Sequence, residues 1–112
     1  MKKVKITDFM SEDLIVLSMN SKSKDEVLRE LVDIIARSEN ILDKEKCYEA
    51  LVAREKLGST GIGKAVAIPH AKTDYVSNLT IGFGISDAGI EFDSLDDMKT
   101  NLFFVFASPV KD

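Results

Sequence analysis

The chain has 112 residues, of which 45% are hydrophobic and 30% charged, close to the averages for a soluble globular domain. This length predicts one domain spanning residues 1–112, with a core that needs no metal or disulfide to hold it together. Fifteen Lys and Arg against nineteen Asp and Glu give a net charge of −4, without a long run of either sign. This balance argues against nucleic acid and anionic lipid as partners.

The cysteine content and the N-terminus favour a cytoplasmic location. Cys47 is the only cysteine, so no internal disulfide can form. Residues 1–4 lead into polar residues and not into the apolar run of about 7–15 residues that a secretory signal requires. The longest apolar run, Leu102 to Ala107, has the length of a strand and is far shorter than the ~20 residues of a membrane span. We therefore expect no insertion into a membrane.

The first half of the chain predicts a short strand and two helices. The apolar run 14–17 indicates a strand or a buried extended segment. Ser23 and Glu26 have the spacing of a capping box, in which the Ser hydroxyl accepts the Glu26 amide and the Glu carboxylate reaches back to the Ser23 amide. A helix is expected from Lys24 to near Ser38, with Asn40 as a left-handed stop. A second helix is expected from a cap at Asp43 to about Leu57.

The second half predicts strands. Three glycines in G-S-T-G-I-G, residues 58–63, predict a loop that is too flexible for helix or strand. Residues 66–68 are short and apolar, and Pro69 should end any strand ladder. Residues 79–86 alternate as a strand does, 90–93 form a candidate short strand, and 94–99 read as a turn or helical segment. Residues 102–107 read as a strand covered on both faces. The fold class is therefore α/β, a mixed sheet of about four to five strands flanked by helices.

The glycine segment resembles a nucleotide-binding loop only in part. Gly58 to Lys64 match the first seven positions of G-x-x-x-x-G-K-[ST]. The eighth residue is Ala65, which lacks the hydroxyl that would hold magnesium. A helix precedes the segment where the motif needs a strand, and Pro69 prevents a long helix after it. A mobile connector is the default interpretation.

His70 is the only histidine, and a structural role is the default for a lone histidine without metal-ligand spacing. Its position next to Pro69 and the glycine loop favours another role, because bare loop amides could bind an anion beside it. A neutral imidazole has a free lone pair that can attack phosphorus. The Arg54 guanidinium could form two hydrogen bonds with phosphate oxygens at once. Together these residues favour phosphoryl transfer.

The stretch from Arg54 to Ala71, R-E-K-L-G-S-T-G-I-G-K-A-V-A-I-P-H-A, closely resembles the signature of a known family. This family is the enzyme IIA domain, fructose/mannitol type, of the bacterial phosphoenolpyruvate-dependent sugar phosphotransferase system, including its nitrogen-regulatory branch. The similarity extends to I-T-D-F-M-S-E-D-L-I-V-L, S-K-D-E-V-L-R-E-L and the closing L-F-F-V-F-A-S-P. It thus covers nearly the whole chain.

The resemblance implies that His70 takes a phosphoryl group from phosphohistidine on the carrier protein HPr and passes it to a cysteine of an enzyme IIB domain. Arg54 matches the family's active-site arginine, and the chain would act as a phosphotransferase without a metal or cofactor. The loop beside the phosphate would be shaped by Gly58, Ser59, Thr60, Gly61 and Gly63.

The chain departs from the family pattern at its C-terminal end. Members carry a second active-site histidine shortly after the A-S-P segment, followed by helices that pack on the sheet, whereas this sequence ends at Asp112. We therefore expect a phosphate site with one imidazole fewer and a sheet lacking one cover. Such a chain, expressed alone, is expected to self-associate.

Two other functions stay open. The same surface could belong to a regulatory binding module that recognises protein partners, with phosphorylation of His70 as the switch. The chain could also be a catalytically inactive fragment.

Overall fold

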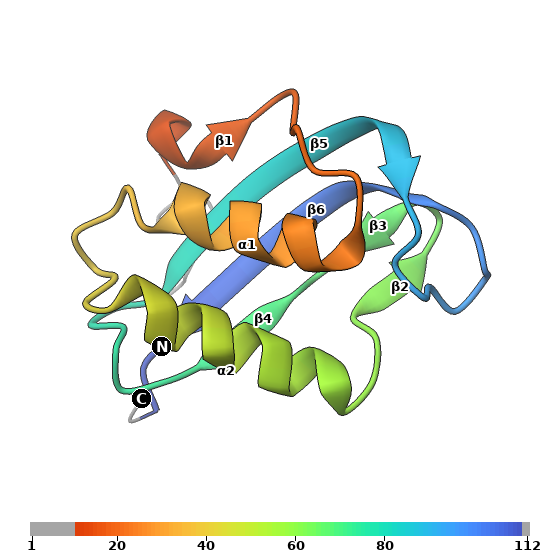
Figure 1. Ribbon diagram of the computed structural model, residues 1–112. Coiled ribbons are helices and arrows are strands. Elements are labelled where there is room, and N and C mark those ends of the chain that lie inside the picture. The colour runs from red at the N-terminus through yellow and green to blue at the C-terminus, as the bar shows by residue number, and fades with distance from the viewer. Residues whose placement is uncertain (1–10, 111–112) are drawn as a thin grey trace, which may run out of the picture.

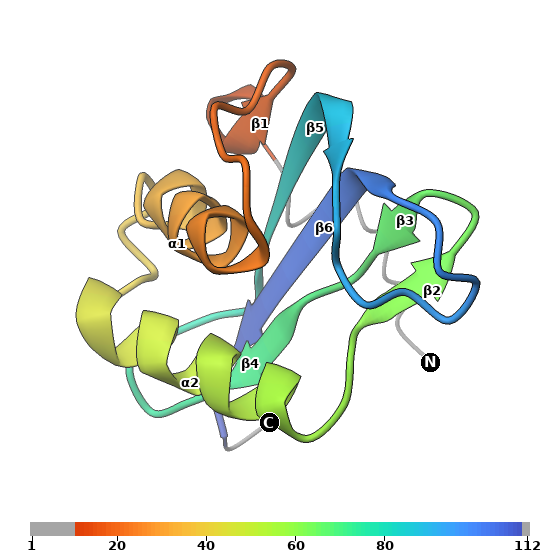
Figure 2. The same ribbon diagram turned by 45° about the vertical axis from the view of Figure 1, so that its right-hand side comes forward.

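The computed structural model describes residues 11–110, so residues 1–4 and the part of the N-terminal family motif before Ser11 lie outside it. Two helices pack on one face of a mixed six-stranded sheet (Figures 1 and 2). The strand order is β1-β5-β6-β3-β2, and β4 also pairs with β6. The elements, after a 3₁₀ turn at Glu12–Leu14, are β1 (Ile15–Val16), α1 (Lys24–Ile35), α2 (Lys44–Lys56), β2 (Gly61–Gly63), β3 (Val66–Ala67), β4 (His70–Lys72), β5 (Thr80–Ile90) and β6 (Thr100–Ser108). The predicted α/β class is confirmed.

Both helices begin at the predicted caps. The Ser23 hydroxyl accepts from the Glu26 amide at 3.3 Å, and the Asp43 carboxylate accepts from the Lys46 amide at 3.1 Å. The reciprocal half of the predicted capping box is different, because the Glu26 carboxylate accepts from the Lys22 amide, at 2.7 Å, and not from that of Ser23. Each cap still satisfies a backbone donor that the first helical turn leaves unpaired.

The end of α1 differs from the prediction. The helix stops at Ile35, three residues before Ser38, and Asn40 does not adopt a left-handed conformation. The Asn40 side-chain amide instead donates to the Thr80 hydroxyl at 3.2 Å, and the backbone carbonyl of Asn40 accepts from the Ser77 amide at 2.9 Å. Asn40 therefore links the loop after α1 to the start of β5 and does not act as a helix stop.

The prediction of an unstructured loop over 58–63 is wrong at its end, where Gly61–Gly63 form β2. This strand pairs antiparallel with β3, and the Lys64–Ala65 turn between them has φ of 55° and 67°. A Cβ on Gly61 would lie 2.5 Å from the Ser94 Oγ, so only glycine lets the strand approach the 92–96 segment this closely.

The strand ladder is interrupted at Ile68 and Pro69, as predicted, but resumes at His70. Val66 pairs with Leu102 and His70 with Phe106, which is the same parallel register of β6 on both sides of the proline. Proline lacks only the N–H donor, and its carbonyl still accepts from the Phe106 amide at 3.0 Å. The strands β2 and β4 are the two that the sequence-based count missed.

The long strands extend beyond their predicted ends. The strand expected over 79–86 continues to Ile90, with a register shift after Ile85 and Gly89 at φ 83°. The separate short strand expected at 90–93 is therefore wrong, because only Ile90 is paired and it belongs to β5. Residues 94–99 form turns, as one of the two predicted alternatives. The predicted strand 14–17 is reduced to β1, which pairs parallel with β5.

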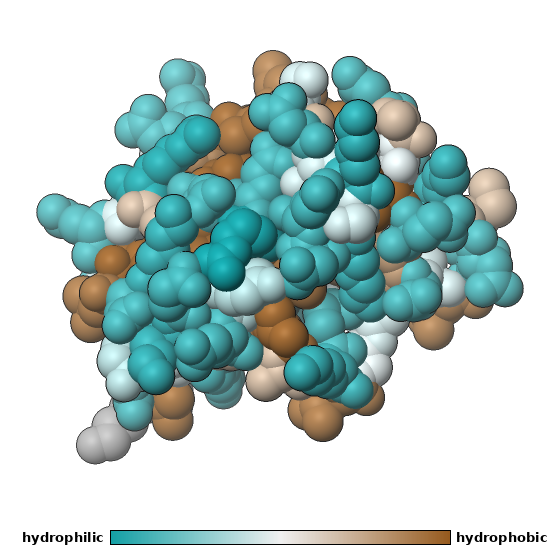
Figure 3. Space-filling view, in the orientation of Figure 1, coloured by the Kyte–Doolittle hydropathy of each residue, from teal (hydrophilic) through white to brown (hydrophobic). Residues whose placement is uncertain are grey.

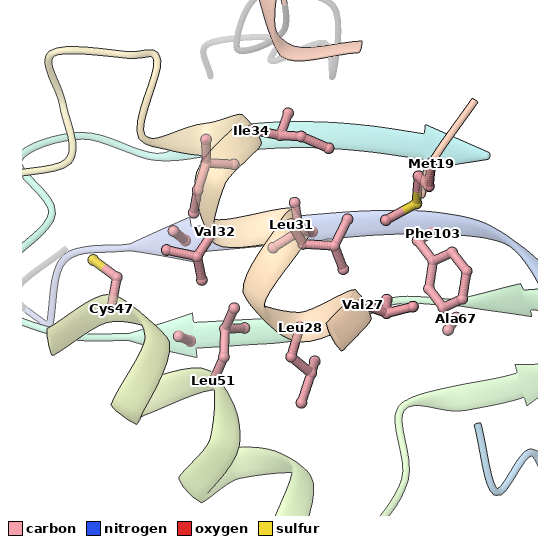
Figure 4. Packing of buried hydrophobic residues seen from close by; sticks show 14 of the residues in the cluster. Met19, Val27, Leu28, Leu31, Val32, Ile34, Cys47, Leu51, Ala67 and Phe103 are labelled. Carbon is pink, nitrogen blue, oxygen red and sulfur yellow. The ribbon is translucent and has the colours of Figure 1, made fainter. Parts of the chain in front are cut away.

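The core lies between α1, α2 and the inner face of the sheet (Figure 4). On β5 the small residues, not the large ones, face α1: a Cβ on Gly82 would lie 2.9 Å from Ile35 Cγ2 and 3.0 Å from Val105 Cγ1. Because glycine has no side chain, Gly82 lets α1 lie close to the sheet. The fully buried large residues include Leu31, Ile34, Ile35, Leu51, Val105 and Phe103.

The other face of β5 and β6 is also apolar. Phe83, Leu102, Phe104 and Phe106 alternate with the core residues and are only partly buried, and the Phe83 and Phe104 rings lie 4.7 Å apart. Within residues 11–110 both helices lie on the opposite face, so the cover on both faces predicted for residues 102–107 is not observed there. The helical side, by contrast, is largely hydrophilic (Figure 3).

Substituting Gly82 by Ala should destabilise the fold by about 1–3 kcal/mol, because the new methyl group overlaps Ile35 and Val105 in a packed core. Thermal unfolding measures this, since ~1 kcal/mol shifts the melting temperature of a domain of this size by about 4–8 °C. Ala88→Ser at an exposed position of the same strand is the control, with a change below about 0.5 kcal/mol. Equal melting temperatures for all three proteins would refute this account of the packing.

We expect the 112-residue chain to self-associate through the outer face of β5 and β6. Sedimentation velocity should show a sedimentation coefficient that rises with protein concentration, and Phe104→Gln should reduce the rise by making that face more polar. A monomer at all concentrations, with a sharp thermal transition, would contradict the prediction.

Candidate functional site

His70 is the first residue of β4, and both of its ring nitrogens have a partner. Nδ1 lies 2.9 Å from the Ile68 carbonyl oxygen, and Nε2 accepts the Arg54 Nε–H at 3.1 Å. A guanidinium can only donate, so Nε2 must carry the lone pair and Nδ1 the proton, which it donates to Ile68. The surroundings therefore hold a half-buried imidazole in one tautomer, with its unprotonated nitrogen beside the Arg54 guanidinium.

Arg54 comes from the last turn of α2 and connects the imidazole to the glycine loop. Besides its bond to His70, it donates from one terminal nitrogen to the Gly58 carbonyl at 2.8 Å. The planar guanidinium has further N–H groups that can turn toward the oxygens of an anion at Nε2. The structure thus brings Arg54, Gly58 and His70 together, as the sequence analysis expected.

Three backbone amides of the glycine loop are bonded within the fold and do not face His70 as free donors. The Thr60 amide donates to the Glu55 carboxylate at 3.0 Å, and the Gly61 amide donates to the Ser59 hydroxyl at 3.0 Å. The Gly58 amide donates to the Glu55 carbonyl at 3.1 Å. These three amides are occupied, so the expected row of bare amides beside His70 is wrong at these positions.

The two loop hydroxyls also have partners inside the fold. Ser59 Oγ donates to the Phe92 carbonyl at 2.7 Å, and Thr60 Oγ1 donates to the Glu55 carboxylate. Gly61 and Gly63 lie in β2, where they approach Ser94 and Asp96. Ser59, Thr60, Gly61 and Gly63 therefore shape the loop and fasten it.

The nucleotide-binding alternative does not fit this geometry. The segment from Gly58 to Lys64 follows α2 and leads into the β2–β3 hairpin, whereas that motif needs a strand before it and a helix after it. The Lys64 amide donates to the Asp96 carboxylate at 2.9 Å. The loop leads into a β-hairpin and is held by carboxylates, so it does not have the geometry of a nucleotide-binding loop.

Glu55 is the residue that sequence reasoning missed. Its side chain is only 4% exposed and pairs with Lys24 at 2.9 Å. The available signal was spacing, because Glu55 follows Cys47 and Leu51 at intervals of four along the buried side of α2. A carboxylate on an apolar stripe indicates a buried partner.

Cys47, the acidic side chains and the helices are the candidates for other kinds of site. Burial raises the pKa of the Cys47 thiol, which makes it a poor nucleophile. No three His, Cys, Asp or Glu side chains within residues 11–110 lie close enough together to hold a metal ion. In the same range no helix has the length and apolar character needed to cross a membrane.

Comparison with protein families gives a match over residues 8–112 to the model described as phosphoenolpyruvate-dependent sugar phosphotransferase system, EIIA 2. The chain is 39% identical over 105 residues to the fructose-specific EIIABC component of Bacillus subtilis, covering 94% of this chain and 16% of that protein. It is 36% identical over 97 residues to the fructose-specific EIIA component of Haloferax volcanii, covering 87% of this chain and 63% of that protein. The chain thus spans less than two thirds of the length of both relatives.

A solved structure shows the same fold at a similar level of identity. The nitrogen regulatory protein IIA-Ntr of Neisseria meningitidis superposes with a TM-score of 0.88 at 35% identity, covering 95% of this chain and 72% of the other. Relatives of both the sugar-specific and the nitrogen-regulatory kind therefore resemble this chain.

Proposed function

Since the chain belongs to the EIIA 2 family of the phosphoenolpyruvate-dependent sugar phosphotransferase system, we propose that it is a phosphoryl carrier with His70 as the phosphorylated residue. Members of this family are phosphotransferases, and relatives named as fructose-specific components match most of the chain. The donor in this proposal is phosphohistidine on HPr, and the acceptor is a cysteine of an enzyme IIB domain.

The proposal depends on one observation, the pair of hydrogen bonds that fixes the His70 ring. Nδ1–H is held by the Ile68 carbonyl at 2.9 Å, so the lone pair is confined to Nε2, which faces Arg54 at 3.1 Å. A nucleophile whose nitrogen carries no proton needs no general base, and the Nε2 lone pair becomes available when the Arg54 N–H turns away from it. Catalysis is then a matter of positioning and charge stabilisation.

The first transfer begins when Nε2 attacks the donor's phosphorus in line with the breaking bond. The new bond is Nε2–P, and the electron pair of the old N–P bond returns to the donor's imidazole. The proton stays on Nδ1 and keeps its hydrogen bond to the Ile68 carbonyl. Arg54 moves its N–H groups from Nε2 to the phosphoryl oxygens, where charge develops.

The second transfer reverses these roles. A thiolate of the acceptor attacks phosphorus, an S–P bond forms, and the Nε2–P electron pair returns to the His70 ring. Arg54 can then donate to Nε2 again, as in the unphosphorylated structure. The carrier ends the cycle in the state in which it began.

A second candidate function is regulation of protein partners by phosphorylation of His70. It is favoured by the 35% identity and TM-score of 0.88 to the nitrogen regulatory protein of Neisseria meningitidis. A phosphoryl group brings up to about two negative charges to a surface where Arg54 provides a positive one. Capture of a kinase or transcription regulator that depends on the phosphorylation state of His70 supports this role, and transfer to a IIB domain supports the carrier role.

Incubation with phosphoenolpyruvate, enzyme I and HPr should label the protein with one acid-labile phosphate, seen as a mass increase. His70→Ala should abolish the label while the protein keeps its fold, because His70 is only partly buried. An unlabelled wild type, or equal labelling of His70→Ala, would overturn the proposal.

Replacing Arg54 by Ala should slow labelling by about 100-fold or more, because the charge that faces the phosphoryl oxygens is lost. Arg54→Lys should be faster than Arg54→Ala but slower than wild type. A lysine ammonium lacks the planar set of donors with which Arg54 can bond the Gly58 carbonyl and phosphate together. Single-turnover transfer from phosphorylated HPr measures these rates. Lys56→Ala, at an exposed position two residues further on, is the control. Equal slowing by Lys56→Ala would show that Arg54 acts only through general surface charge.

A further inference from the structure

We propose that Glu55 is a positioning residue for phosphoryl transfer, holding the glycine loop where Arg54 can bond Gly58 and His70 together. This inference rests on the proposed function. Arg54 and Glu55 are consecutive residues at the end of α2, and their side chains form hydrogen bonds with the same loop at two different residues. Arg54 bonds the Gly58 carbonyl at 2.8 Å, and Glu55 bonds the Thr60 amide at 3.0 Å.

The burial and the partners of Glu55 indicate that its contact with Thr60 is specific. Its side chain is 4% exposed, and a carboxylate this buried costs stability unless it is paired. It accepts from the Thr60 amide and hydroxyl and from the Lys24 ammonium, which lies 2.9 Å away. Lys24 is the first residue of α1, so Glu55 ties the loop to the N-terminus of the other helix.

Lys24 is itself held by two further contacts. Its ammonium lies 3.2 Å from the Asp93 carboxylate and 4.6 Å from the centroid of the Phe92 ring. The 92–96 segment also closes the outer side of the loop, where Ser59 bonds the Phe92 carbonyl and the Leu95 amide bonds the Gly61 carbonyl at 3.2 Å. The loop is thus fixed between Glu55 on the inside and this segment on the outside.

The contribution of Glu55 matters most when His70 is phosphorylated. Arg54 then leaves Nε2, and its remaining contact with the loop, at Gly58, must orient the guanidinium toward the phosphoryl oxygens. Glu55 does not touch the phosphate, so its hold on Thr60 is the same in both states. If Thr60 is released, the Gly58 carbonyl moves, and Arg54 loses its second anchor.

The test compares Glu55→Met with wild type in single-turnover transfer from phosphorylated HPr, because the methionine side chain removes the oxygen that accepts from both Thr60 donors. We expect the transfer rate to fall between about 10- and 100-fold, since displacements of about 1 Å cost that much in catalysis. Thr60→Val loses the hydroxyl but keeps the amide donor, so it should slow transfer by less than Glu55→Met does, and Thr60→Ser, which keeps both donors, should slow it less than Thr60→Val. Glu49→Met, 65% exposed on the same helix, is the matched control and should have no effect.

A second measurement separates positioning from loss of fold. The ¹⁵N chemical shift of His70 Nε2 in the unphosphorylated protein reports the hydrogen bond from Arg54. In Glu55→Met it should move toward the value of a neutral imidazole nitrogen without a donor. The proposal is overturned if Glu55→Met transfers at the wild-type rate, or if it slows while this shift is unchanged. Failure of the wild type to accept phosphate would instead overturn the proposed function, and the shift would still test the role of Glu55.

Discussion

The hydrogen bond between His70 Nδ1 and the Ile68 carbonyl is the interaction on which the proposed chemistry of this site depends. Without it the imidazole could rotate or change tautomer, and Nε2 would not be fixed as the proposed nucleophile. The bond spans only two residues, so the backbone around Pro69 sets its geometry. A side chain with few rotamers next to a rigid residue is held at a small cost in entropy.

The sheet explains why the Ile68 carbonyl is available. β3 and β4 pair with β6 in one continuous register, and the two residues between them are Ile68 and Pro69. The Ile68 amide bonds the Thr60 carbonyl, and the Pro69 carbonyl accepts from Phe106. The Ile68 carbonyl can therefore serve the imidazole. The interruption at Pro69 supplies the acceptor, while the register on either side keeps it in place.

Local signals in the sequence predicted the helices, and the family resemblance placed Arg54 and His70 in one site. Capping residues and apolar periodicity act within one element, so Ser23 and Asp43 could be identified without tertiary information. β2 and β4 were missed because glycine and proline are poor strand formers, and their pairing is decided by β6 and the 92–96 segment. The role of Glu55 was hidden for the same reason, since its partners Lys24 and Thr60 come from a helix and a loop that only the fold brings together.

The position of the phosphoryl group on the imidazole tests the central claim most directly. NMR of ¹⁵N-histidine-labelled protein after phosphorylation resolves which ring nitrogen is bonded to phosphorus and which carries a proton. The geometry predicts phosphorus on His70 Nε2, with Nδ1 protonated before and after transfer. Phosphorus on Nδ1, or an unphosphorylated ring protonated only on Nε2, would contradict the account.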